Sequence, residues 1–171
     1  MSVSNAWLLE PNDFLSIAIG DYEMVEYLDG STCFSVPGAP NYCNQILYWK
    51  NNLVPVMDLG VLLGKPAQGS GAFMSLIAYQ EQPGSALEYL ALKVRTAPEK
   101  ILVDDTQVCE LPAEINEGLL MPLCLSCFRH ADRSVVILNI TSLCSAEFRD
   151  VVNLADDLED EQSDFYGVNA I

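Results

Sequence analysis

The chain has 171 residues, half of them hydrophobic, and its 24 acidic and 8 basic side chains give a formal net charge of −16. That length is enough for one domain or for two small coupled subdomains with a substantial core. The acidic balance argues against binding to nucleic acid or to an anionic membrane surface, because both require basic patches.

The N-terminal region predicts several short strands that are separated by turns. The apolar runs cover residues 6–9, 14–19, 22–28 and 31–36. Gly20-Asp21 and Asp29-Gly30 separate them, and Asp-Gly is a strong hairpin signal. Short strands at regular spacing are typical of a small barrel or sandwich.

A hairpin is predicted where two apolar runs, residues 42–49 and 53–59, flank Lys50, Asn51 and Asn52. Asn tolerates positive φ at little cost, so these residues suit the turn. Two interpretations of the tip stay open. Trp49 is either a core residue or an exposed anchor, and Lys50 is either solvated or part of a binding hot spot.

The second half of the chain repeats this pattern. Strands are predicted over residues 73–80, 88–94, 101–103 and 108–111, followed by a hairpin from 119 to 140. Residues 53–63 and 134–144 each contain an apolar strand, then Asp58 or Asn139, then a short helical turn. Two similar halves predict two small β-barrels, about residues 6–66 and about 72–145, which share a core.

A C-terminal helix is predicted from about Ser145, and residues 146–171 form this helix and an acidic tail. The apolar face of the helix comprises Phe148, Val151, Val152, Ala155 and Leu158. Acidic residues cluster at positions 156–161. We expect fraying after about Leu158, because negative charges at a helix C-terminus oppose the helix dipole.

The cysteines and the single histidine offer little material for chemistry. Cys124 and Cys127 form one CxxC pair, but residues three apart in a strand face opposite sides and a metal site needs about four ligands. No nucleophile elbow or phosphate-binding loop is present, so we expect no metal, no cofactor and no catalysis. A thiol-dependent enzyme using a cysteine with His130 remains an alternative. No secretory signal is visible, which favours reduced thiols in a cytoplasmic protein.

The sequence resembles the CheW-like coupling proteins over roughly residues 6–145. The segments that carry the likeness are residues 37–42, 45–47, 53–59 and 62–64, together with the strand order over 73–80, 89–95, 101–111 and 135–143. The resemblance implies a mainly β fold with short helices. Two intertwined five-stranded β-barrels would pack around a core between them.

The resemblance also implies a function. It indicates a non-catalytic adaptor that couples chemoreceptors to a histidine kinase in a bacterial chemosensory array. The kinase would associate barrel to barrel through its own CheW-like regulatory domain. The cytoplasmic tip of the receptor would dock in the groove between the subdomains.

The same likeness places the candidate binding residues. Receptor binding falls on Trp49, Lys50 and Asn51, where Lys50 matches an arginine of the family. Kinase binding falls on Tyr22 and Met24, which are two residues apart and therefore expected on one face of a strand.

The sequence departs from the family pattern at several positions, and these substitutions indicate which kind of family member it is. Besides Lys50, Gln45 replaces a glycine and Val94-Arg95 replaces Val-Asp. These changes indicate an accessory member, as in the chemosensory systems that control type IV pili and twitching motility. A kinase-only adaptor and a homo-oligomeric scaffold remain alternatives.

Overall fold

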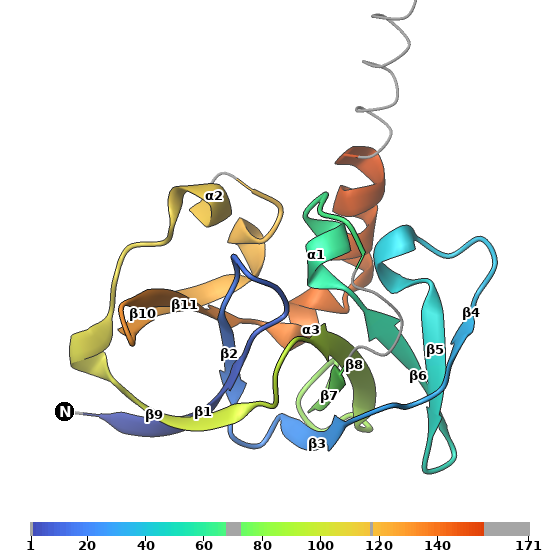
Figure 1. Cartoon of the computed structure of the whole chain (residues 1–171), viewed down its shortest axis with the longest axis horizontal. Helices are drawn as coiled ribbons and strands as arrows, with labels where there is room; N and C mark the ends of the chain where they lie inside the picture. Colours follow the sequence, from blue (N-terminus) through green and yellow to red (C-terminus); the bar gives the residue numbers. More distant parts are fainter. Residues whose placement is uncertain (1, 68–72, 117, 156–171) are drawn as a thin grey trace, which may run out of the picture.

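The computed structural model describes residues 2–67, 73–116 and 118–155, which form two β-sheets and several short helices (Figure 1). The five-stranded sheet has the order β10-β11-β2-β1-β9, and the six-stranded sheet has the order β3-β7-β8-β6-β5-β4. Within the described ranges, no helix combines the length and the apolar character needed to span a bilayer. The mainly β fold predicted from the sequence is confirmed.

The bounds of the elements follow the two sheets. The five-stranded sheet contains β1 (Val3–Leu9), β2 (Ile17–Gly20), β9 (Glu99–Asp104), β10 (Cys124–His130) and β11 (Arg133–Leu138). The six-stranded sheet contains β3 (Met24–Leu28), β4 (Cys33–Ser35), β5 (Gln45–Trp49), β6 (Asn52–Met57), β7 (Phe73–Tyr79) and β8 (Glu88–Val94). The short helices are η1 (Asn41–Cys43), α1 (Leu59–Leu62), η2 (Asp105–Gln107), α2 (Ala113–Asn116), η3 (Met121–Leu123) and α3 (Ile140–Leu143).

The two halves of the chain exchange their first two strands. The β1–β2 hairpin joins β9, β10 and β11 through a parallel pairing of β2 with β11, while β7 and β8 join β3–β6 through a parallel pairing of β8 with β6. The sheets are therefore intertwined, as the resemblance implied. Each sheet takes two strands from the opposite half of the chain, so the sheets do not follow the division into residues 6–66 and 72–145.

Three apolar clusters result from this exchange. Leu47, Val54 and Leu76 lie in the cluster inside the six-stranded sheet, and Ala18 and Phe128 lie in the cluster inside the five-stranded sheet. The largest cluster lies between the sheets and takes buried side chains from both, among them Leu9, Ile17, Ile19, Val136 and Leu138 from one and Met57, Ile77, Leu90, Leu92 and Val94 from the other. The predicted core shared by the two barrels is confirmed.

The internal repeat has a structural basis in two capped helical turns. Asp58 Oδ1 accepts hydrogen bonds from the backbone N–H groups of Gly60 (2.9 Å) and Val61 (3.1 Å) at the start of α1. Asn139 Oδ1 accepts one from Ser142 N (3.1 Å) at the start of α3. A side-chain oxygen at this position satisfies N–H groups that the helix leaves unpaired. The repeat is thus the same strand, cap and helix used twice.

Several element bounds differ from the sequence prediction. Residues 108–111 form no strand, because only Val108 bridges to Phe128 and Pro112 then precedes α2. The strand predicted from residue 119 begins at Cys124, since Pro122 lies within η3. In the C-terminal helix, described over residues 146–155, Phe148 and Val152 are buried but Val151 is 48% exposed. Leu158 and the expected fraying lie outside the described residues.

Candidate protein-binding surfaces

The tip of the β5–β6 hairpin is a tight turn made without glycine. Lys50 and Asn51 have φ values of +42° and +67°, the pairing of positive angles that a two-residue hairpin turn requires. The Tyr48 hydroxyl donates to Asn51 Oδ1 at 2.7 Å, and Asn52 Nδ2 donates to the Lys50 carbonyl oxygen at 3.1 Å. These hydrogen bonds hold Lys50 and Asn51 at the exposed end of the hairpin.

Trp49 packs at the end of the six-stranded sheet and is not a freely exposed side chain. It is half-buried against the core inside the six-stranded sheet, with its ring centroid 5.1 Å from that of Tyr89. Its indole N–H donates to Glu26 Oε2 at 2.8 Å. Lys50 Nζ lies 3.7 Å from the same carboxylate oxygen and 4.7 Å from the centre of the Trp49 ring. Trp49 therefore positions Lys50, whose side chain remains 70% exposed.

The outer side of β4, β5 and β6 forms an exposed apolar face. Cross-strand pairing places Phe34 opposite Ile46, Ile46 opposite Pro55, and Tyr48 opposite Leu53. Phe34 is 56% exposed, Tyr48 62% and Leu53 70%, whereas Leu47 and Val54 point the other way and are buried. We refer to these five residues, Phe34, Ile46, Tyr48, Leu53 and Pro55, as the apolar face.

Acidic residues are absent from the segment that carries this face. Residues 31–57 contain no Asp or Glu, and Lys50 is their single charged side chain, in a chain that carries 24 acidic residues. Sequence reasoning placed a site at the hairpin tip but missed the apolar face beside it. The acid-free segment, with the apolar Tyr48 and Leu53 directly flanking the polar turn, was the signal that could have found it.

The structure does not place Tyr22 and Met24 on one strand face. Strand β3 begins at Met24, and Tyr22 lies in the turn formed by residues 21–23. Glu23 folds this turn back, since its Oε2 accepts a hydrogen bond from Gly20 N at 2.5 Å. Tyr22 is 99% exposed, whereas Met24 is half-buried and packs against the shared core. The expectation of a common strand face was wrong because the turn is longer than Gly20-Asp21.

A cavity of about 670 Å³ lies where the two sheets meet, a size typical of ligand pockets. Its walls come from α1 and the residues after it, from α2, from the loop before β2 and from Ala155 of the C-terminal helix. Phe14 and Lys65 both line it, with Lys65 Nζ 5.3 Å from the centre of the Phe14 ring. Trp49, Lys50 and Asn51 are not among its lining residues, so the hairpin tip and this cavity are separate surfaces.

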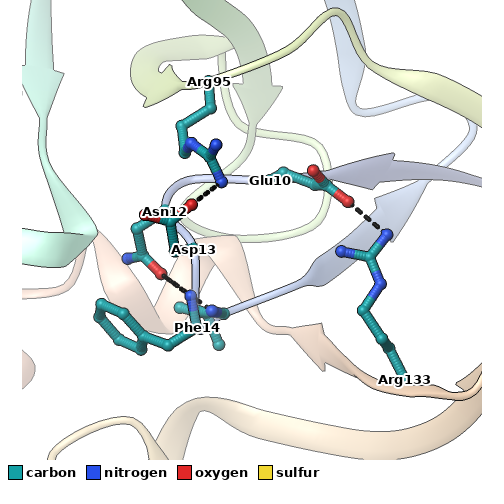
Figure 2. Close-up of polar contacts among 7 residues, drawn as sticks. Glu10, Asn12, Asp13, Phe14, Arg95 and Arg133 are labelled. Carbon is teal, nitrogen blue, oxygen red and sulfur yellow. Dashed lines mark hydrogen bonds and ion pairs between the residues drawn. The ribbon is translucent and has the colours of Figure 1, made fainter.

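The loop that carries Phe14 is tied to both sheets (Figure 2). Glu10 pairs with Arg133 of β11 at 2.6 Å, and Asp13 pairs with Arg95, which follows β8. Asn12 Oδ1 accepts from the backbone N–H groups of Phe14 and Leu15. Arg95, which departs from the family pattern, therefore has a local role: its ion pair with Asp13 helps to hold the loop whose Phe14 and Leu15 line the cavity.

The cysteines are free thiols in apolar surroundings. Burial raises the pKa of Cys144 to about 12. Burial and contact with Cys109 also raise the pKa of Cys127 to about 12. Cys124 Sγ points to the Leu120 carbonyl oxygen, so the two members of the CxxC pair have different neighbours. Among the described residues, no three His, Cys, Asp or Glu side chains gather as metal ligands would.

Comparisons with known proteins agree with this architecture. No protein-family model matches the sequence, and a search of curated proteins finds no relative. Among solved structures, the chain is similar to the scaffolding protein TtCheW from Thermoanaerobacter tengcongensis, with a TM-score of 0.63 and 14% sequence identity. The match covers 81% of this chain and 90% of TtCheW. The chain therefore has a CheW-like fold.

Proposed function

We propose that this protein is a non-catalytic adaptor that couples chemoreceptors to a histidine kinase. The observation that carries the proposal is the apolar face: in a chain with a net charge of −16, the segment 31–57 has no acidic residue and exposes Phe34, Tyr48 and Leu53. Exposed apolar patches of this kind are typical of protein-binding surfaces. The CheW-like fold and the scaffold described for TtCheW support the same interpretation.

We place the receptor-facing surface on the apolar face and the hairpin tip, on the outer side of the six-stranded sheet, and not in the groove between the subdomains that the resemblance implied. Tyr48 and Leu53 supply apolar contact area, and Lys50 and Asn51 supply a cation and an amide at its edge. A chemoreceptor tip is helical, and its apolar stripe would lie across the strands while a carboxylate meets Lys50. Trp49 acts in this site by holding Lys50 in place through the shared contact with Glu26.

The kinase-facing surface centres on Tyr22 and Met24. Tyr22 is an almost fully exposed aromatic side chain, a common type of interface anchor. Met24 starts the edge strand β3 and anchors it on the shared core, so its contribution would be to fix the position of Tyr22. An edge strand beside an exposed aromatic residue could pair with the barrel of a CheW-like regulatory domain, which supports barrel-to-barrel association.

An accessory role, as in systems controlling type IV pili and twitching motility, fits the substitutions at the tip. Lys50 keeps the charge of the family arginine but not its planar, bidentate geometry, so its contact with a carboxylate would be weaker and more sensitive to salt. We place the protein in the cytoplasm, where kinases and receptor tips of this type meet. A kinase-only adaptor is the alternative if receptor tips do not bind.

The test is a set of calorimetric titrations with a chemoreceptor tip and a kinase regulatory domain from the same organism. The proposal predicts that each partner binds the wild-type protein and that both bind together. Tyr22→Ala should weaken kinase binding and leave receptor binding unchanged. The control is Leu125→Ala, which removes a 64% exposed side chain from the other sheet and should affect neither. Absence of binding to both partners would contradict the adaptor.

A further inference from the structure

Two thiols face each other at the edge of the five-stranded sheet. Val108 and Phe128 are antiparallel bridge partners, which places Cys109 directly opposite Cys127 on β10. The Cys109 backbone N–H donates to the Cys127 carbonyl oxygen at 2.9 Å, and the two Sγ atoms are also 2.9 Å apart. The backbone thus holds the sulfur atoms in contact without a covalent bond.

The two thiols differ in accessibility, which sets an order of reaction. Cys109 is partly exposed, whereas Cys127 is buried. The Ser134 hydroxyl lies 3.9 Å from Cys109 Sγ, so a polar group accompanies the accessible sulfur. A reagent from solvent therefore meets Cys109 first, and Cys127 is positioned to resolve the product.

We propose that Cys109 and Cys127 are a reversible redox pair whose oxidant is a low-molecular-weight disulfide such as glutathione disulfide. The Cys109 thiolate attacks one sulfur of glutathione disulfide, forming a mixed disulfide and releasing one glutathione thiolate. The Cys127 sulfur then attacks Cys109 Sγ, forming the protein disulfide and releasing the second glutathione. The two protein thiols lose two electrons and two protons, and two molecules of glutathione carry them away.

The disulfide would act on the cavity between the sheets. The segment that it closes, from Cys109 to Cys127, contains α2 and η3. Pro112, Glu114, Ile115 and Leu119 of this segment line the cavity. In the reduced protein, the isolated bridge at Val108 and the hydrogen bond of Cys109 hold the start of this segment to β10. A covalent link there restricts opening of one cavity wall, so oxidation stiffens that wall.

Other cysteines provide internal controls. The side chain of Cys144 is hydrogen-bonded to Tyr79, which gives this thiol a partner of its own. Cys124 Sγ points to the Leu120 carbonyl oxygen at 3.1 Å. Cys144→Ser should therefore leave the redox pair intact, while Cys109→Ser and Cys127→Ala should remove it.

The first experiment is peptide mapping of the full-length protein after equilibration in glutathione buffers and blocking of the remaining thiols. We expect two of the six thiols to be lost under oxidising conditions, with residues 109 and 127 joined in one pair of peptides. The Cys144→Ser variant should give the same disulfide-linked peptides. In the Cys109→Ser variant, no pair of thiols should be oxidised to a disulfide. A persistent glutathione adduct on Cys109, a disulfide between other cysteines or no oxidation would overturn the proposal.

The second experiment compares amide hydrogen exchange in α2 and η3 between the oxidised and reduced wild-type protein. We expect exchange to slow by about tenfold or more on oxidation, since opening of the segment is restricted. Cys109→Ser should exchange at the same rate in both buffers. Equal rates in the oxidised and reduced wild type would overturn the assigned effect on the cavity wall.

Discussion

Two hairpin units of this molecule share a backbone and differ in their outer surfaces. The first unit consists of β5, β6 and α1, and the second consists of β10, β11 and α3. Both turns use two non-glycine residues at positive φ, Lys50 and Asn51 in the first, Ala131 and Asp132 in the second. In both, the cap residue donates its own backbone N–H to a preceding 3₁₀ helix: Asp58 to Tyr42 at 2.8 Å, and Asn139 to Leu123 at 2.9 Å.

The side chains on the outer faces of the two units do not match. The two units can be aligned on their turns and cap residues. In this alignment Phe34 corresponds to Cys109, Ile46 to Cys127, Tyr48 to Arg129, Leu53 to Ser134 and Pro55 to Val136. At four of these five positions the second unit has a thiol, a cation or a hydroxyl, and at the fifth it has Val136; Cys127 and Val136 are buried, whereas Phe34, Tyr48 and Leu53 are exposed. The fold constrains the turn, cap and core positions, whereas the outer face was free to take separate roles.

Equivalent core positions should be equally important in the two units. Leu59 and Ile140 each follow a cap residue and are fully buried in the shared core. We expect Leu59→Ala and Ile140→Ala each to lower the free energy of unfolding by about 2–5 kcal/mol. Chemical denaturation monitored by fluorescence would measure it. Two separate unfolding transitions in either variant would show that the units do not share one core.

Substitution of the two cap residues should lower the free energy of unfolding by smaller amounts, which differ between the units. Asp58 is 4% exposed and accepts two backbone hydrogen bonds, whereas Asn139 accepts one. We expect Asp58→Ala to cost about 2 kcal/mol and Asn139→Ala about 1 kcal/mol. Asp58→Asn is the matched control, because it keeps the acceptor oxygen and should retain most of the stability. A larger loss for Asn139→Ala than for Asp58→Ala would contradict the difference between the caps.

Much of the repeat was predictable because its signals are local. Asp58 and Asn139 sit between an apolar strand and a helical turn, and capping depends on residues close in sequence. The exchange of β1–β2 and β7–β8 was not predictable in the same way, since strand pairing depends on contacts far along the chain. The apolar face was missed for the same reason: strand alternation shows that Tyr48 and Leu53 share a side, but not whether another element covers it.

The thiol of Cys144 should make the stability of the protein depend on pH. The ordinary cysteine pKa is 9.0, and burial raises that of Cys144 to about 12. The protonated thiol is favoured by folding, so its contribution is complete below pH 9 and is lost as the pH rises towards 12. Between pH 8 and pH 10 the wild type should lose about 1 kcal/mol more stability than Cys144→Ala. Equal losses in paired denaturation curves would show that Cys144 does not titrate in this way.

The smallest stability effect is expected at the hairpin tip. The Lys50 and Glu26 side chains are 70% and 44% exposed, so solvent screens their ion pair. Lys50→Glu should change the free energy of unfolding by about 1 kcal/mol or less. Trp49→Ala is the contrasting variant, because it removes the ring that packs against Tyr89 and should cost more. Equal effects of the two substitutions would show that Trp49 does not support the barrel end.

The most direct test of the central claim compares Tyr48→Glu with Arg129→Glu in titrations against a chemoreceptor tip. The two residues occupy equivalent exposed positions, one on the apolar face and the other on the second unit. We predict that Tyr48→Glu weakens binding by about tenfold or more, as expected for an interface anchor. Arg129→Glu, which changes the net charge by a larger amount, should leave the affinity unchanged. Unchanged affinity in Tyr48→Glu, or an equal loss in both variants, would contradict a receptor-binding role for the apolar face.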